Sequence, residues 1–147
     1  MVPDLSDFAG GWRLARRIED ARAGLTGRFE GQAVFRPGAG GLVVTETGVL
    51  RYGAGQPVQA ERRYIWRVEA GGIAVFFDDG RPFHRFSPAA PEARHDCAPD
   101  LYHVRYDFSV WPRWRVVWHV TGPRKNYVMT SDHTPMKTRS SAMPTGA

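Results

Sequence analysis

Residues 102–108 have the sequence Tyr-His-Val-Arg-Tyr-Asp-Phe, and residues 114–120 have the sequence Trp-Arg-Val-Val-Trp-His-Val. In both stretches every second residue is aromatic or apolar, and most residues between them are polar or charged. Because side chains alternate between the two faces of an extended chain, this period of two predicts β-strands with one buried face. A turn at Pro112 separates the two predicted strands.

The same alternation continues along the rest of the chain. Breaks rich in glycine or proline interrupt it, as at residues 37–41 and 53–57, and no helical period persists beyond about two turns. About ten short runs result, which is typical of an all-β barrel or sandwich. We therefore predict one antiparallel β-barrel, closed or nearly closed, over residues 1–131. The polar, small residues of 132–147 predict a disordered tail.

Composition narrows the classes of partner and compartment. The chain has 147 residues and a net charge of +5, and all but two of its 20 basic residues are arginines spread along the sequence. Because they do not cluster, we do not expect nucleic-acid binding. Cys97 is the single cysteine, so no internal disulfide forms, which fits a reducing compartment. Without a secretory signal or a run of about 18 apolar residues, we expect a cytoplasmic protein that does not span a membrane.

Polar residues on otherwise apolar strand faces are the informative anomaly. The alternation points the following side chains toward the core: Arg16, Glu46, Arg62, Tyr64, Tyr102, Tyr106, Lys125 and Tyr127. A buried charge is costly unless it is paired. Either these groups form structural salt bridges, such as Glu46 with Arg16 or Arg62, or they line a lumen that binds a small acidic or amphipathic molecule. The sequence leaves both interpretations open.

Two further hypotheses come from other classes of function. An enzyme acting at the barrel mouth would use Asp79, His84 and His95 as acid–base groups on loops. A structural or interaction domain would have a tightly packed interior and no ligand. We predict no metal site, because His95-Asp96-Cys97 lacks the spacing of a ligand set. Oligomeric state is not predictable from this sequence.

The beginning of the chain resembles a known group of barrels. Phe8-x-Gly10-Gly11-Trp12, followed by strands only, is similar to the start of the calycins: lipocalins, fatty-acid-binding proteins and the nitrobindin-like group. The resemblance implies that Trp12 lies at the closed end of the barrel and that Arg124 or Lys125 packs on it. In nitrobindin-like proteins a histidine near the chain end binds haem iron, and His133 is the late candidate here. We expect no cofactor, with haem as the alternative.

The whole pattern also resembles a bacterial family of lipocalin-like proteins, the DUF6314 type, over roughly residues 8–131. This resemblance implies a calycin fold and no particular activity. The motifs that carry it are Gly11-Trp12-x-Leu14-x-Arg16, Glu46-x-Gly48, Arg63-Tyr64-x-Trp66, Asp79-Gly80-Arg81-x-Phe83-His84, His95-x-Cys97-x-x-Asp100-x-Tyr102 and Trp118-x-Val120-x-Gly122-Pro123-Arg124-Lys125.

Overall fold

The structure, a computed structural model, describes residues 3–136. A short 3-10 helix, η1 (Leu5–Phe8), precedes ten strands. The strands are β1 (Gly10–Asp20), β2 (Leu25–Gly38), β3 (Gly41–Tyr52), β4 (Val58–Glu69), β5 (Gly72–Phe77), β6 (Pro82–Phe86), β7 (Glu92–Cys97), β8 (Asp100–Asp107), β9 (Trp114–Gly122) and β10 (Lys125–Pro135). The predicted all-β architecture of about ten strands is confirmed.

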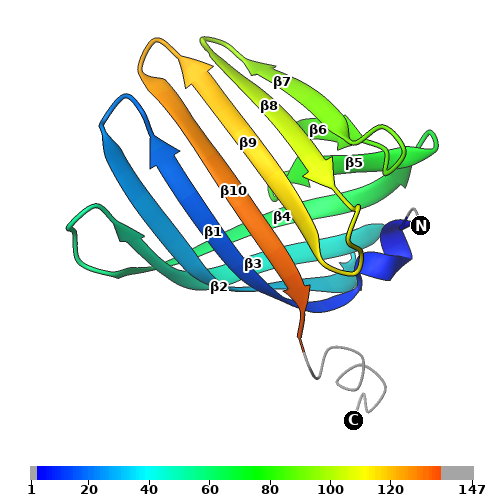
Figure 1. The fold of residues 1–147 in the computed structure, drawn as a ribbon. Helices are drawn as coiled ribbons and strands as arrows, with labels where there is room; N and C mark the ends of the chain where they lie inside the picture. Colours follow the sequence, from blue (N-terminus) through cyan, green and yellow to red (C-terminus); the bar gives the residue numbers. More distant parts are fainter. Residues whose placement is uncertain (1–2, 137–147) are drawn as a thin grey trace.

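All ten strands belong to one antiparallel sheet that curls into a barrel (Figure 1). Their order is β6-β5-β4-β3-β2-β1-β10-β9-β8-β7, so β1 pairs with both β2 and β10. The two end strands, β6 and β7, share no backbone ladder within residues 3–136, and a single bridge between Ser87 and Ala90 closes the turn that joins them. The barrel is therefore nearly closed, with one seam between β6 and β7.

Helix η1 closes one end of the barrel. Phe8, its last residue, is fully buried. The Phe8 ring lies 5.2 Å from the ring of Trp66 and 5.3 Å from that of Trp114, both edge to face. Trp12 is also fully buried, and its indole N–H donates a 2.9 Å hydrogen bond to the Phe8 carbonyl. Because large aromatic side chains bury much apolar area, this cluster forms the main core of the domain.

The position of Trp12 at this end agrees with the resemblance to calycins, but its expected basic neighbours lie elsewhere. Trp12 pairs with Pro135 at the end of β10, whereas Lys125 begins that strand at the opposite end of the barrel. Arg124 directly precedes Lys125. An antiparallel partner of β1 must begin beside the end of β1, so these two residues cannot reach Trp12. The expectation that Arg124 or Lys125 packs on Trp12 is wrong.

Strand β10 is longer than the sequence predicts. It continues through Asp132 and His133 to Pro135, and His133 pairs with both Leu14 and Trp114. The predicted boundary at residue 131 is therefore wrong. The apolar residues of the alternation stop at Met129, but the period of two continues inside the barrel through the polar residues Ser131 and His133, both buried. The remainder of the predicted tail, residues 137–147, lies outside the described residues.

Burial along the interior face defines an open end, opposite η1. On β4, Trp66 and Tyr64 are buried, and Arg62, the next residue on that face, is exposed. Arg62 pairs with buried Glu46 on β3, and cross-strand partners present their side chains on the same face. The interior side chains therefore become accessible toward the hairpins that join β3 to β4 and β9 to β10. We call this end the mouth.

Candidate functional site

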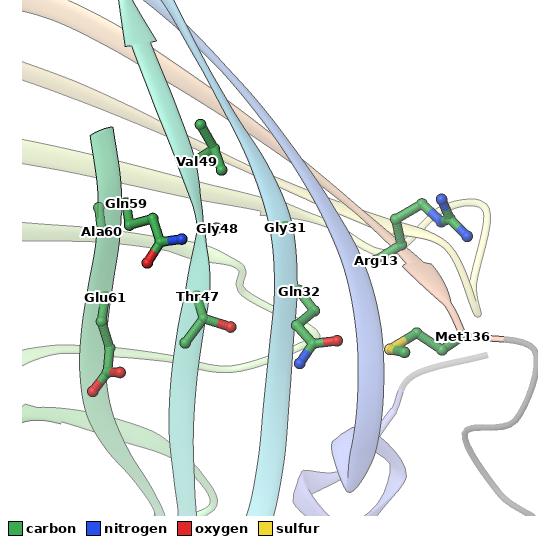
Figure 2. A pocket seen from close by; sticks show the side chains of 10 residues that line it. All are labelled: Arg13, Gly31, Gln32, Thr47, Gly48, Val49, Gln59, Ala60, Glu61 and Met136. Atoms are coloured by element: carbon green, nitrogen blue, oxygen red, sulfur yellow. The ribbon is translucent and has the colours of Figure 1, made fainter. Parts of the chain in front are cut away.

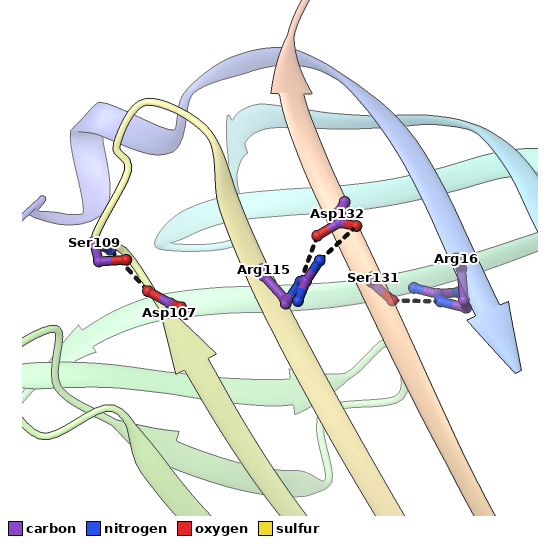
Figure 3. A network of polar contacts seen from close by, with 6 residues as sticks. All are labelled: Arg16, Asp107, Ser109, Arg115, Ser131 and Asp132. Carbon is purple, nitrogen blue, oxygen red and sulfur yellow. Dashed lines mark hydrogen bonds and ion pairs between the residues drawn. The ribbon is translucent and has the colours of Figure 1, made fainter. Parts of the chain in front are cut away.

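A buried ion pair between Arg16 and Glu46 stands near the middle of the barrel interior, and Figure 3 shows Arg16 beside Ser131, its other partner. Arg16 on β1 donates to both carboxylate oxygens of Glu46 on β3, over 3.0 and 3.1 Å. The Arg16 Nε–H also donates a 2.7 Å hydrogen bond to the Ser131 hydroxyl on β10. Arg16 and Glu46 are only 8% and 7% exposed. The two-pronged geometry is the arrangement in which an arginine and a carboxylate bind most strongly.

This pair is of the kind that the first interpretation expects for Arg16, a salt bridge with Glu46. Its guanidinium is neutralised by Glu46, so Arg16 acts as a structural partner in this conformation. On the outer face beside it, Arg115 binds Asp132 through two contacts of 2.7 and 3.2 Å. Figure 3 shows the Arg16–Ser131 and Arg115–Asp132 contacts on neighbouring residues of β10, whose side chains point to opposite faces of the sheet.

Arg62 differs from Arg16 in exposure and in partners. It lies across the β3–β4 pair from Glu46, but no carboxylate forms a salt bridge with it among residues 3–136. Its charge acts on Tyr64, two residues along the same face: burial raises the pKa of the Tyr64 phenol, and the Arg62 charge opposes that rise. Arg62 therefore places a cation on the interior face of β4 at the mouth, where the Asp20 carboxylate, on the same face at the end of β1, accepts a hydrogen bond from the Tyr52 hydroxyl.

Aromatic rings continue from Tyr64, the next interior residue after Arg62 on β4, whose ring lies 6.2 Å from that of Phe83. Phe83 on β6 is the centre of a group of rings that we call the mouth cluster. Its ring lies 4.6 Å from that of Phe77, 5.1 Å from Trp118, 5.2 Å from His95 and 5.6 Å from Tyr102. Phe83 is buried, whereas the rings around it are half-buried and therefore partly reachable from the mouth. The cluster offers an apolar surface of the kind that binds the body of a small amphipathic molecule.

The other predicted interior residues lie at different depths. Tyr106 is buried, and its hydroxyl lies 2.8 Å from Nε2 of His84. Burial raises the pKa of Tyr106 well above its usual value, so the phenol stays protonated. Tyr127 and Lys125 are half-buried at the mouth, where the Lys125 ammonium forms a 2.9 Å ion pair with Asp100. Lys125 is therefore a weaker candidate than Arg62 for an acidic ligand.

Asp79, His84 and His95 do not form an acid–base site. Asp79 is exposed in the β5–β6 turn, where it binds Arg81 at 2.7 Å. His84 is buried instead of lying on a loop, because β6 begins at Pro82 and brings it inside the barrel. His95 packs on Phe83 in the mouth cluster. No contact between described side chains joins Asp79 to either histidine. The structure therefore brings His84 and His95 together around the Phe83 ring, at 4.4 and 5.2 Å, and the expectation that all three residues lie together on loops is wrong.

A small cavity lies below the mouth cluster. It has a volume of about 30 Å³, and its lining includes Arg16, Glu46, His84, Trp114 and His133. His133 stacks face to face on Trp114 with ring centroids 3.6 Å apart. This cavity has no room for a porphyrin, and Trp114 covers one face of the imidazole. The residues around His133 therefore do not fit a haem. Among the described residues, no group of three or more His, Cys, Asp or Glu side chains is placed to hold a metal ion.

A wider hollow lies on the outside of the barrel (Figure 2). It has a volume of about 660 Å³ and lies over β1 to β4. The sheet bends there because Gly31 and Gly48 pair closely: a Cβ on Gly31 would lie 1.9 Å from the Thr47 carbonyl oxygen. Its polar lining, including Arg13 and Gln32, is largely exposed. None of the predicted site residues lines it, so we place the candidate site at the mouth.

Sequence reasoning missed several residues of the interior. The alternation predicts a buried face for Trp118 and does not single out Phe83, and nothing in the pattern distinguishes a half-buried ring at the mouth from a buried one deeper in the barrel. His133 and Ser131 lie on the interior face of a strand that the sequence ends too early. The period of two from Lys125 to His133 was the available signal, but the pattern of apolar residues alone hides it.

The fold and the interior define a calycin barrel, also called lipocalin-like. A solved structure with a similar fold is that of an S-type phycobiliprotein lyase, CPES, from Guillardia theta. It superposes with a TM-score of 0.58 at 7% sequence identity, covering 88% of this chain and 87% of that one. At that identity the likeness concerns the fold alone. A search among curated proteins finds no match.

The sequence itself matches a family model over residues 8–135, that of a family of unknown function, DUF6314. The chain belongs to this family, as its motifs indicate. Within the described part of the chain, no helix is both long and apolar enough to cross a membrane.

Proposed function

We propose that this protein binds a small, acidic, amphipathic molecule at the mouth of its barrel. The observation that carries the proposal is Arg62, an exposed cation on the interior face, two residues from Tyr64, whose ring packs on Phe83 of the mouth cluster. A guanidinium without a salt-bridge partner binds carboxylate, sulfonate or phosphate groups through charge-assisted hydrogen bonds. The mouth cluster then covers the apolar part of the ligand.

The partners of the interior charges leave Arg62 as the cation available to an acidic ligand. The buried Arg16–Glu46 pair is neutral as a unit, and the Lys125–Asp100 pair at the rim is neutral as well. Among the described salt bridges Arg62 is the interior cation without a carboxylate partner, and the Asp20 carboxylate on β1 is occupied by the Tyr52 hydroxyl. The shared fold with a phycobiliprotein lyase is compatible with a ligand-related role, but the proposal rests on the mouth itself.

Two dyes that differ in one charge test this proposal. 1-Anilinonaphthalene-8-sulfonate is anionic, and N-phenyl-1-naphthylamine has the same ring system without the sulfonate. Arg62→Gln should weaken binding of the anionic dye about tenfold, because a charged hydrogen bond contributes about 1.4 kcal/mol at a solvated site. Binding of the neutral dye should change less than about twofold.

Arg63→Gln is the matched control, since Arg63 is the next residue on β4 and points outward, where it binds Glu61 at 3.1 Å. It should leave both dissociation constants unchanged. Near-ultraviolet circular dichroism of each variant ensures that the dyes report on folded protein. Equal weakening by both arginine variants, or equal weakening for both dyes, would contradict a specific role for Arg62.

A further inference from the structure

Three buried polar atoms around the interior cavity have no hydrogen-bond partner: Nδ1 of His84, Nδ1 of His133 and Nε1 of Trp114. Their side chains are 6%, 3% and 3% exposed, and all three line the same cavity of about 30 Å³. Buried polar atoms in native proteins nearly always have partners. Three unpaired atoms on one cavity therefore indicate that the site is built to receive a hydrogen-bonding guest.

The chemistry of the lining defines the guest. The Trp114 indole N–H can only donate, so the guest must accept a hydrogen bond. Burial lowers the pKa of His84 and of His133 to about 3, so both imidazoles are neutral at physiological pH. The charges of Arg16 and Glu46 cancel. With no free charge in the lining, an ion would lose its hydration without gaining a partner.

The volume limits the size of the guest. A cavity needs about 10–15 Å³ to hold one water molecule, so about 30 Å³ accepts one or two atoms the size of a water oxygen. We propose that this cavity is a second binding site, below the mouth, for a small uncharged oxygen group that accepts from Trp114 and bridges to His84 and His133. Water and a hydroxyl group of a larger ligand share this chemistry. The assignment to a ligand hydroxyl rests on the proposed function, whereas the assignment to water does not.

Nuclear magnetic resonance of the full chain separates these sources. In buffer, the Trp114 indole proton should show a nuclear Overhauser effect to water with the negative sign of a long-lived bound molecule. With added ¹³C-methanol, which carries one neutral hydroxyl, the same proton should show an effect to the methyl group. Sodium acetate, of similar size but charged, should give none.

His133→Phe provides the variant, because phenylalanine keeps the stacking on Trp114 and removes Nδ1. The water effect at Trp114 should then be lost or fall severalfold. His119→Phe is the matched control, since His119 is exposed on the outer face of β9, and it should retain the full effect. The wild-type measurements decide the matter even if His133→Phe does not fold.

A nuclear Overhauser effect from the Trp114 indole proton to water alone assigns the site to water. An additional effect to the methyl group of methanol shows that a ligand hydroxyl fits. Absence of both effects in folded wild-type protein overturns the proposal, and so does acetate entering as readily as methanol. These results are independent of the mouth: Arg62→Gln failing to change dye binding would refute the proposed function and leave the Trp114 signals as they are.

Discussion

Removing the Glu46 carboxylate should destabilise the protein more than removing its partner Arg16. Glu46→Leu leaves the buried Arg16 guanidinium without a counter-charge, and breaking a buried ion pair on one side costs about 3–5 kcal/mol. Arg16→Met leaves Glu46, which still faces Arg62 across the β3–β4 pair. Arg62 is exposed and can turn toward the carboxylate, so we expect a cost of about 1–3 kcal/mol.

The double variant completes the cycle. Replacing both members of a buried ion pair with apolar side chains is often close to neutral, so Arg16→Met combined with Glu46→Leu should be more stable than Glu46→Leu alone. Urea unfolding, followed by tryptophan fluorescence and interpreted only where the m-values agree, measures all four free energies. Equal losses in the two single variants that add in the double variant would refute the reasoning, because they would show that the two side chains act independently.

Three further outcomes follow from buried features of the barrel. His84 and His133 each have a pKa of about 3 in the folded protein and 6.5 in the unfolded chain. As the pH falls, the unfolded chain therefore binds protons first, and the free energy of unfolding should decrease between pH 6.5 and pH 3. Urea unfolding should show a decrease of about 1.4 kcal/mol per pH unit for each histidine. A flat profile would contradict their burial as neutral groups. Phe8→Ala should cost about 3–5 kcal/mol in the same assay, since it empties the ring cluster at the closed end; a loss under about 1 kcal/mol would show that η1 is dispensable. Gly31→Ala should cost about 3 kcal/mol or more because its Cβ would meet backbone at 1.9 Å, whereas Gly38→Ala, whose Cβ would meet only a valine methyl at 3.2 Å, should cost under about 1 kcal/mol. Equal costs would mean that the bend of β2 and β3 relaxes freely.

The sequence predicts the faces of the strands well, because a period of two is a direct consequence of extended backbone geometry. Arg16, Glu46 and Tyr64 all point inward as their positions in the alternation require. The same pattern carries no information about depth along the barrel axis. Arg16 and Arg62 look equivalent in the sequence, but one is buried in an ion pair and the other is exposed at the mouth. Only the pairing of strands distant in the chain sets that depth.

The errors at His84 and His133 have one physical cause. Both are polar residues whose environment is created by partners far away: His84 faces Tyr106, and His133 stacks on Trp114. A polar residue in a local pattern is normally assigned to a loop or to the surface, since its burial costs free energy unless a partner is supplied. The partners come from other strands, so local pattern analysis placed His84 on a loop and His133 in a tail.

The seam between β6 and β7 has a consequence for how much the barrel can hold. Across every other boundary the circumference is fixed by backbone hydrogen bonds, whereas across this one Phe83 meets His95 and Tyr102 through ring contacts at 5.2 and 5.6 Å. Moving these rings apart breaks no backbone hydrogen bonds between strands. The barrel can therefore widen at this seam, beside the mouth cluster, to fit a ligand. The hydrogen-bonded strands of the rest of the wall, and helix η1 at the closed end, need not move.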